Sequence, residues 1–189
     1  MGCKKVLVAC EFSGVVRDAF VAAGHDAMSC DLEPATSPGW HTQGDVRDFL
    51  NDGWDLMIAH PPCDHLAISG NRWYYDKPEL RQAAMEFVVG LYESPVPMVA
   101  VENPVGRLST MWRKPDQYVQ PWMFGHGETK KTGLWLKNLP KLEPTDVVCG
   151  RKGATVKMPD SKGRKQKRSI TYAGIAKAMA EQWGCLANV

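Results

Sequence analysis

Short apolar runs alternate with stretches of helical periodicity through the first half of the chain. Four runs have the length of a buried strand, namely 5–10, 25–30, 56–59 and 98–101. Between them, apolar residues recur every three or four positions, which is typical of helices with one buried face. These helices are predicted at 15–23, 46–51 and 79–92. The alternation predicts an α/β fold with a mostly parallel sheet and helices on both faces.

Beyond residue 106 the pattern is weaker. Residues 134–136 are predicted to form an edge strand, and 175–183 a terminal helix. A chain of 189 residues is the size of one domain, so we expect 1–189 to fold as a single unit.

Polar residues follow the predicted strands, where ligands bind in an open parallel sheet. They are Glu11, Phe12, Ser13, Gly14, Asp31, Asp45, His60, Cys63, Glu102 and Asn103. Neither a G-x-G-x-x-G sequence nor a P-loop is present. An acid after the second strand is typical of ribose binding, so a nucleoside-bearing cofactor is expected, either NAD or S-adenosylmethionine.

Each candidate also has a structural interpretation. Asp31 and Asp45 are suited to capping a turn or helix. Cys63 has the character of a small core residue, and Glu102 that of a partner for a lysine. His60, Cys63 and His65 lie close together, but no distant group of matching spacing completes a metal site, so no metal is expected.

Composition narrows the class of protein. Charged residues make up 23% and hydrophobic residues 44% of the chain, and no apolar run is long enough to span a bilayer. The six cysteines form no C-x-x-C pair, which argues against a zinc ribbon or a disulfide framework. We therefore expect a cytoplasmic protein without a membrane partner, either a monomer or a weak dimer.

The net charge of +2 conceals an uneven distribution. Residues 151–168 carry eight basic side chains and one acid, a charge of +7, so the rest of the chain sums to −5. A basic loop on an acidic body favours a polyanionic partner such as nucleic acid, although an ordinary solvated loop would have the same composition.

The order of the motifs resembles that of the C5-cytosine DNA methyltransferase family. Phe12-Ser13-Gly14 is similar to the F-x-G motif, Asp31 to the second-strand acid, and Gly44-Asp45-Val46 to the third motif. Pro61-Pro62-Cys63 matches the Pro-Pro-Cys motif, and Glu102-Asn103-Pro104 is similar to the Glu-Asn-Val motif. Residues 171–176 loosely resemble the tenth motif. The resemblance is to a small, phage-type member of that family.

This resemblance implies a Rossmann-like, S-adenosylmethionine-dependent fold and transfer of a methyl group to cytosine in DNA. It makes Cys63 and Glu102 the catalytic residues. The cofactor would be bound by Phe12, Ser13, Gly14, Asp31, Leu32, Asp45, Val46 and Pro61. The substrate would be bound by His60, His65, Asn103, Lys130, Lys131, Arg164 and Lys165.

The chemistry of cytosine explains these two catalytic residue types. Its C5 atom is a poor nucleophile until a thiolate adds to C6, and we expect the electropositive end of a following helix to assist ionisation of Cys63. We expect burial to raise the pKa of Glu102, so that it donates a proton to the ring. A base in duplex DNA must first be flipped out of the helix.

Several features depart from the family pattern. Val16 replaces the second glycine of the first motif, and His60 stands where a small or apolar residue is usual. The Gln-x-Arg-x-Arg motif is absent, with only Gln117, Gln120, Lys130 and Lys131 as stand-ins.

The chain between residue 104 and the terminal helix is too short for a target recognition domain, and the basic loop within 141–170 takes its place. Low sequence specificity is expected, because such a loop contacts phosphates. Two other functions remain open: N-methylation of a nucleobase, and nucleic-acid binding by an inactive methyltransferase fold.

Overall fold

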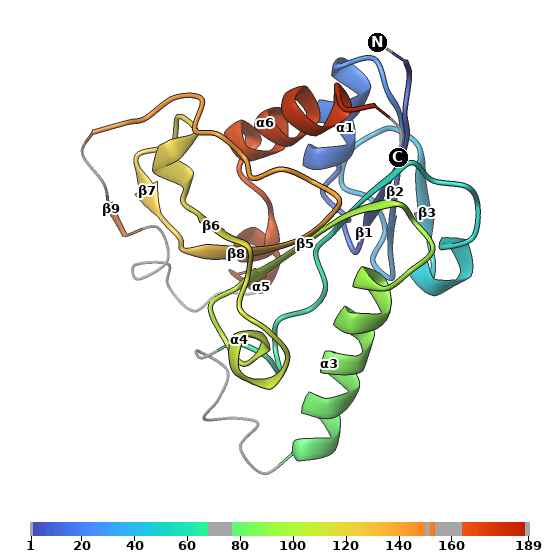
Figure 1. Ribbon diagram of the computed structural model, residues 1–189, viewed down its shortest axis with the longest axis vertical. Helices are drawn as coiled ribbons and strands as arrows, with labels where there is room; N and C mark the ends of the chain where they lie inside the picture. Colours follow the sequence, from blue (N-terminus) through green and yellow to red (C-terminus); the bar gives the residue numbers. More distant parts are fainter. Residues whose placement is uncertain (1, 68–76, 150–151, 154–163, 188–189) are drawn as a thin grey trace.

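A seven-stranded sheet runs through the centre of the molecule in the order β3-β2-β1-β4-β5-β8-β6 (Figure 1). The computed structural model describes residues 2–67, 77–149, 152–153 and 164–187. The strands are β1 (Lys5–Ala9), β2 (Asp26–Asp31), β3 (His41–Gln43), β4 (Leu56–Ala59), β5 (Met98–Pro104), β6 (Gln117–Val119) and β8 (Thr132–Lys137). Strands β1 to β5 pair in parallel, whereas β8 is antiparallel to both β5 and β6. A separate pair joins β7 (Glu128–Thr129) to β9 (Lys152–Gly153).

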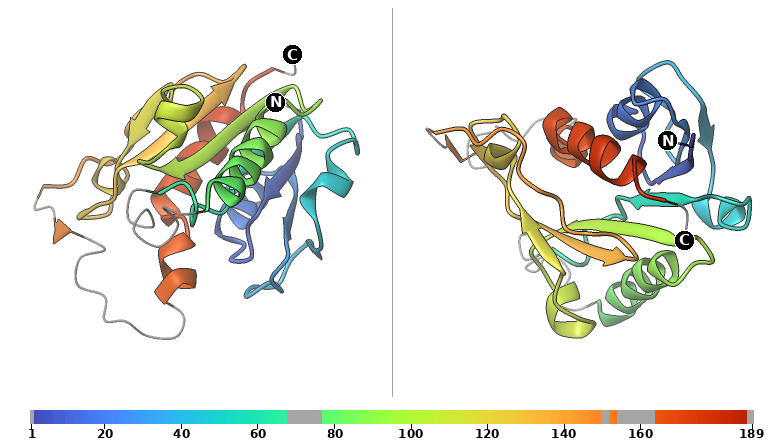
Figure 2. Two further views of the ribbon diagram at one scale, coloured as in Figure 1. Left: turned by 90° about the horizontal axis from the view of Figure 1, so that it is seen from below. Right: turned by 45° about the horizontal axis from the view of Figure 1, so that its top comes forward.

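Helices cover both faces of this sheet (Figure 2). Helices α1 (Val15–Ala22) and α6 (Ala173–Gly184) pack together on one face, and α3 (Pro78–Tyr92) lies on the other. The shorter elements are η1 (Val46–Phe49), α4 (Leu108–Met111), η3 (Pro121–Met123) and α5 (Arg164–Ser169).

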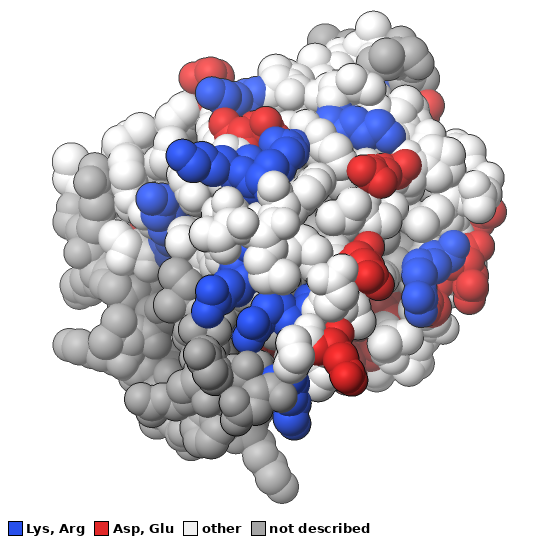
Figure 3. All heavy atoms as spheres, turned by 60° about the horizontal axis from the view of Figure 1, so that its bottom comes forward, with Lys and Arg blue, Asp and Glu red and all other residues white. Residues whose placement is uncertain are grey.

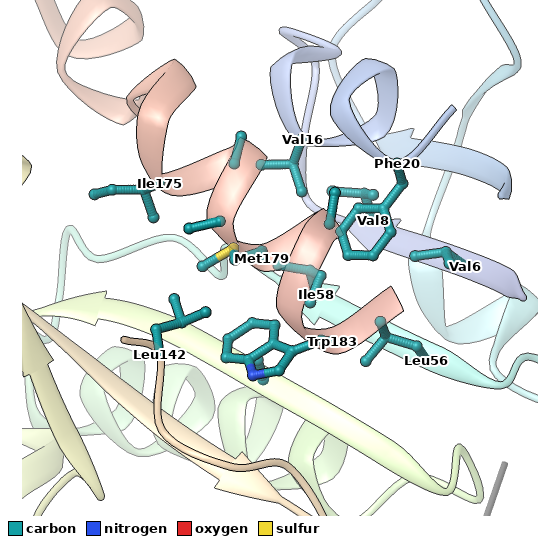
Figure 4. Close-up of a cluster of buried hydrophobic side chains, with 14 of the residues drawn as sticks. Val6, Val8, Val16, Phe20, Leu56, Ile58, Leu142, Ile175, Met179 and Trp183 are labelled. Carbon is teal, nitrogen blue, oxygen red and sulfur yellow. The ribbon is translucent and has the colours of Figure 1, made fainter. Parts of the chain in front are cut away.

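Side-chain alternation along the strands divides the core into two layers. Val6 and Val8 of β1 pack with α1 and α6, while Leu7 and Ala9 contribute to the layer under α3. Trp183 of α6 reaches into the first layer, where it lies near Ile58, Leu56 and Leu142 (Figure 4). Because both faces of each central strand are buried, these strands are continuously apolar.

The predicted α/β class and the helices on both faces are confirmed, but some elements differ. The strand predicted at 134–136 is longer and is not at the edge, because β6 pairs with its outer side. Strand β5 continues to Pro104, so Glu102 and Asn103 lie within it, not beyond its end. Strand β3 was not predicted, since its sequence His-Thr-Gln has no apolar residue. Among the described residues, no helix is long and apolar enough to cross a membrane.

Candidate active site

The turn between β1 and α1 is organised by a buried carboxylate. Glu11 accepts hydrogen bonds from the backbone N–H groups of Val16 at 2.7 Å and Arg17 at 3.2 Å, and from the Ser13 hydroxyl at 3.1 Å. The first N–H groups of a helix lack partners within the helix, and a negative charge there is favourable. Ser13, predicted to bind the cofactor, therefore directs its hydroxyl to Glu11.

Gly14 has a structural reason to be glycine. It has φ +76°, and a Cβ atom there would lie 2.2 Å from Ser37 Oγ and 2.4 Å from the Arg17 guanidinium. Arg17 is fully buried and donates to Ser29 Oγ, Ser37 Oγ and the Pro38 carbonyl. The glycine thus lets this network hold the loop after β2 against the first turn of α1.

Val16, which replaces the second glycine of the family motif, is fully buried. Its side chain lies in the core between the sheet and α6, together with Val8 and Phe20 (Figure 4). The extra bulk is therefore accommodated by the core.

Two carboxylates converge beside the ends of β1 and β2. Burial raises the pKa of the Cys10 thiol, and the charges of Asp31 and Asp45 raise it further. Asp31 Oδ1 accepts from the Glu33 N–H at 2.9 Å. Asp45 caps η1 through the Arg47 N–H and also pairs with the Arg47 side chain, and these hydrogen bonds lower the pKa of Asp45 to about 2. Asp45 therefore caps η1, as its structural interpretation predicted.

The apolar cofactor candidates lie around these acids. Leu32 follows Asp31 directly and is 73% exposed, whereas Phe12 is half-buried. Val46, at the start of η1, is only 4% exposed and belongs to the core layer under α3. An adenosyl group requires acceptors for its hydroxyl and amino groups and an apolar surface for its ring. The two carboxylates and the exposed Leu32 supply both kinds of contact, so these residues fit S-adenosylmethionine.

His60 and Glu102 form a buried pair at the centre of the sheet edge. His60 Nδ1 lies 2.8 Å from Glu102 Oε2, and the two side chains are 8% and 16% exposed. His60 follows β4, and Glu102 lies on the neighbouring strand β5 opposite Leu134 of β8. Among the described residues, the second ring nitrogen of His60, Nε2, is buried and has no hydrogen-bond partner.

His60 and Glu102 shift each other's pKa. Burial by itself would raise the pKa of Glu102, but the hydrogen bond and charge of His60, together with Lys130 and the Thr132 hydroxyl, lower it. Burial would lower the pKa of His60, and Glu102 outweighs this effect and raises it. The expectation that burial raises the pKa of Glu102 is therefore wrong, because His60 and Lys130 act on the carboxyl group and favour its charged form.

Cys63 lies on a turn that is anchored to the end of β5. The Cys63 carbonyl accepts from the N–H groups of Leu66 and Ala67, and Arg107 N–H donates to the Leu66 carbonyl at 2.7 Å. Gly106 makes this close approach feasible, since a Cβ atom there would lie 2.1 Å from the Leu66 oxygen. His65 lies half-buried within the same turn.

The Cys63 thiol is not activated in the free protein. Burial raises its pKa, and the nearby charges of Asp64 and Glu102 raise it further. Cys63 is followed by a single turn over 64–66, so the expected assistance from a following helix is not observed within the described residues. Glu102 nevertheless acts electrostatically on this thiol, so the two predicted catalytic residues belong to one site.

Asn103 and Pro61, predicted to contact ligands, bond to each other. Asn103 is buried, and its side-chain nitrogen donates to the Pro61 carbonyl at 3.1 Å. This bond fixes the Pro-Pro-Cys segment to β5, immediately beside Glu102.

A small cavity next to Glu102 is lined by Lys130, Thr132, Thr171 and Tyr172. Lys130 acts electrostatically on His60, Cys63 and Glu102. Its ammonium donates to the Arg168 carbonyl at 2.8 Å, at the end of α5. Lys130, predicted as substrate-binding from the sequence, is thus brought beside Glu102.

The other stand-ins for the missing arginines lie elsewhere. Lys131 is exposed and stacks on Tyr118, with its ammonium 4.1 Å from the ring centroid. Gln117 bonds both backbone groups of Leu142 and is therefore structural. Gln120 precedes η3, and its side-chain oxygen is buried.

The basic segment is only partly described. Arg164 and Lys165 begin helix α5, so this part of the predicted loop is helical. The basic residues Arg151, Lys157 and Lys162 lie outside the described residues. On the face that Figure 3 shows, basic and acidic side chains are interspersed, with more of the basic ones toward the left of the view and more of the acidic ones toward the right.

Sequence reasoning missed several residues that hold the site together, among them Arg17, Gly106 and Thr132. Glu11 was expected at this edge of the sheet, but its role in capping α1 was not. His126 Nε2 accepts the Gly174 N–H at 3.0 Å, and Tyr172 donates to the Glu128 carboxylate. Two features of the sequence could have pointed to these residues, namely a glutamate directly after the first strand and the polar residues grouped in the segment 126–132.

Comparison with known proteins places the fold. No family model and no curated protein matches the chain. A solved structure of an E. coli prophage protein, described as a DNA modification methyltransferase, aligns with TM-score 0.51 and 18% identity over 84% of this chain and 56% of its own. The Entamoeba histolytica methyltransferase EhMeth aligns with TM-score 0.51 and 10% identity over 78% and 58%. The S. pombe Dnmt2 methyltransferase aligns with TM-score 0.47 and 15% identity over 73% and 50%.

The chain therefore spans little more than half the length of the first two of these proteins. At such low identity the likeness concerns the fold alone. The mostly parallel seven-stranded sheet with its covering helices has the Rossmann-like fold of the methyltransferases.

Proposed function

We propose that this protein is an S-adenosylmethionine-dependent methyltransferase that modifies C5 of cytosine in DNA through a covalent bond to Cys63. The observation that carries the proposal is the joining of the Pro61-Pro62-Cys63 segment to β5 at the residue next to Glu102, through the Asn103–Pro61 hydrogen bond of 3.1 Å. A thiol and a carboxyl group on adjoining segments are what nucleophilic addition to a protonated pyrimidine ring requires.

The cofactor would lie beside the catalytic pair. Asp31 would accept hydrogen bonds from the ribose, Asp45 from the adenine amino group, and Leu32 would cover the adenine ring. Bound S-adenosylmethionine supplies an electrophilic methyl group. Glu11 holds the turn after β1 in place by capping α1, so it acts on cofactor binding through the backbone.

The residues of the chain then have distinct roles in the reaction. The Cys63 thiolate adds to C6 of cytosine, while Glu102 holds a proton at N3 and accepts a hydrogen bond from the exocyclic amine. After methylation, loss of the C5 proton expels the thiolate. Asn103 holds the Pro61 carbonyl and so positions the segment that carries the thiol.

Nucleic acid would approach over the basic segment 151–168. Lys130 joins the catalytic pair to the end of α5, which belongs to the basic segment 151–168. A phosphate held by this segment would bring the strand toward Glu102. Because such contacts are electrostatic, we propose binding that weakens steeply with salt and has little sequence preference.

The proposal is tested by incubating the full chain with methyl-labelled cofactor and duplex DNA, single-stranded DNA, RNA or deoxycytidine nucleotides. We expect label in DNA, recovered as 5-methylcytosine after digestion to nucleosides. An N-methylated base would replace the C5 assignment. Absence of both transfer and calorimetric cofactor binding would instead support an inactive nucleic-acid-binding fold.

Replacing Asp31 with asparagine should weaken cofactor binding by about tenfold, which corresponds to the loss of roughly one charge-assisted hydrogen bond. The asparagine side chain can still accept from Glu33 N–H, so the loop should keep its shape. Titration calorimetry with S-adenosylmethionine measures the effect, and Glu33→Gln, an exposed neighbour, is the control. Unchanged affinity in Asp31→Asn would place the ribose elsewhere.

A further inference from the structure

The His60–Glu102 pair holds one proton in a buried place beside the predicted nucleophile. His60 Nδ1 lies 2.8 Å from Glu102 Oε2, and both side chains are largely withdrawn from water. Glu11 after β1 and Lys130 between β7 and β8 also act electrostatically on His60, and Glu102 acts in turn on Cys63, on the turn after β4. An isolated carboxylate at this depth would be costly, and a proton on His60 compensates its charge.

The proposed reaction needs that proton elsewhere. Addition of a thiolate to C6 pushes an electron pair through the ring to N3, which must gain a proton as the bond forms. An ionised Glu102 has none to give. The nearest proton is the one on His60 Nδ1, in line with the carboxylate that would face N3.

We infer that His60 stores the proton that Glu102 delivers to N3 of the target base, and that this proton returns to His60 when the product forms. This inference rests on the proposed cytosine C5 reaction. As the Cys63 sulfur–C6 bond forms, the Nδ1–H bond breaks, a proton passes to Glu102, and Glu102 protonates N3. After methylation, the C5 proton leaves to solvent, the sulfur–C6 bond breaks, and the N3 proton returns through Glu102 to Nδ1. His60 acts through Glu102 and is therefore a positioning residue.

The histidine also has the features that such a role requires. It directly precedes the Pro-Pro-Cys segment, so the proton store and the nucleophile move on one stretch of backbone. The main chain is fixed by the His60 N–H bond to the Ala9 carbonyl at 2.9 Å. Among the described residues, Nε2 has no partner, so the Nδ1 proton is the one that the ring shares with another group, and Nε2 keeps its own proton when Nδ1 gives its proton up.

The test uses the variant His60→Asn, whose side-chain amide places a donor where Nδ1 stood but holds no titratable proton. Single-turnover methyl transfer by the wild type and the variant is measured from pH 5 to pH 9, with saturating cofactor and DNA. The ratio of the two rates is plotted, because ionisation of Cys63 is common to both proteins and cancels. In the variant, Glu102 must take its proton from water.

We expect the wild type to be on the order of 10²-fold faster than the variant at neutral pH. The wild type should be the faster protein because the raised pKa of His60 keeps a proton on the His60–Glu102 pair to a higher pH than a carboxyl group alone would. The ratio should therefore approach one in acid, rise by up to about tenfold per pH unit, and level off above the pKa of His60. Cofactor affinity should not change.

His25→Asn is the matched control. His25 lies at the opposite end of β1, where it accepts a hydrogen bond from the Lys4 N–H. The ratio of the wild-type rate to the His25→Asn rate should stay near one at every pH. A wild type that methylates cytosine while the His60→Asn ratio is the same at all pH values would overturn the proton store and leave the proposed function intact. A wild type that transfers no methyl group to any cytosine substrate would overturn the proposed function and this inference with it.

Discussion

Replacing Cys63 with alanine is expected to reduce methyl transfer by at least about four orders of magnitude, as removal of a covalent nucleophile does in other enzymes. Without the thiolate, nothing adds to C6, and the ring stays too poor in electrons at C5 to react. Transfer of labelled methyl groups into DNA measures the rate. The variant should fold normally, because the turn is held by backbone bonds from Leu66 and Ala67 to the Cys63 carbonyl.

Cofactor binding separates this result from a general loss of structure. Asp31 ends β2 and Asp45 caps η1, both in other segments than the Cys63 turn, so the affinity of Cys63→Ala for S-adenosylmethionine should change by no more than about twofold. Cys149→Ala, at an exposed cysteine, is the matched control and should keep full activity. If Cys63→Ala retained substantial transfer, a covalent mechanism through this residue would be excluded.

Replacing Trp183 with alanine should lower the free energy of unfolding by about 3–5 kcal/mol, a large part of the roughly 5–15 kcal/mol that stabilises a typical domain. The indole is fully buried between α6 and the sheet, and its N–H donates to the Pro140 carbonyl at 2.9 Å. Truncation would leave a cavity in the layer drawn in Figure 4 and an unpaired carbonyl. Urea unfolding followed by circular dichroism measures the loss.

Two further variants make this result interpretable. Trp183→Phe keeps most of the volume and removes the hydrogen bond, so it should cost only about 1–2 kcal/mol and fold even if the alanine variant does not. Trp40→Ala, the same truncation at a residue 47% exposed, should cost less than the buried substitution. Equal effects at positions 40 and 183 would show that α6 contributes little to the core.

Most of the parallel half of the sheet could be predicted, because burial on both faces makes β1, β4 and the first part of β5 largely apolar. Strand β2 was also located, although it contains Asp26, Ser29 and Asp31, whereas β3 was missed. The order of the predicted strands along the chain indicated the carboxyl edge. Strand β6 could not be found, because Gln117-Tyr118-Val119 has no such run and forms only by pairing with β8. Because β6 was not predicted, residues 134–136 were expected to form the edge strand of the sheet.

The composition of the site was easier to predict than its charges. Cys63 and Glu102 stand out next to apolar strands, but the contact from His60 to Glu102 joins residues 42 positions apart. Sequence spacing does not reveal such a contact, and the direction of the pKa shift of Glu102 depends on it. Lys130 was predicted to bind substrate, as a stand-in for a missing arginine, but its action on Glu102 was not predicted, since its position there is created by the antiparallel return of β8.

Glu102 and Cys63 differ in how they are attached to the scaffold. The backbone of Glu102 lies in the ladder between β5 and β8, opposite Leu134, whereas Cys63 lies on a turn anchored at Leu66 by Arg107 and Gly106. A substrate that contacts both groups would be oriented by the carboxylate, whose place is set by the sheet. The turn that carries Cys63 would then have to adjust to the position of the bound substrate. Lengthening or stiffening residues 63–67 would therefore change the range of substrates that the protein accepts.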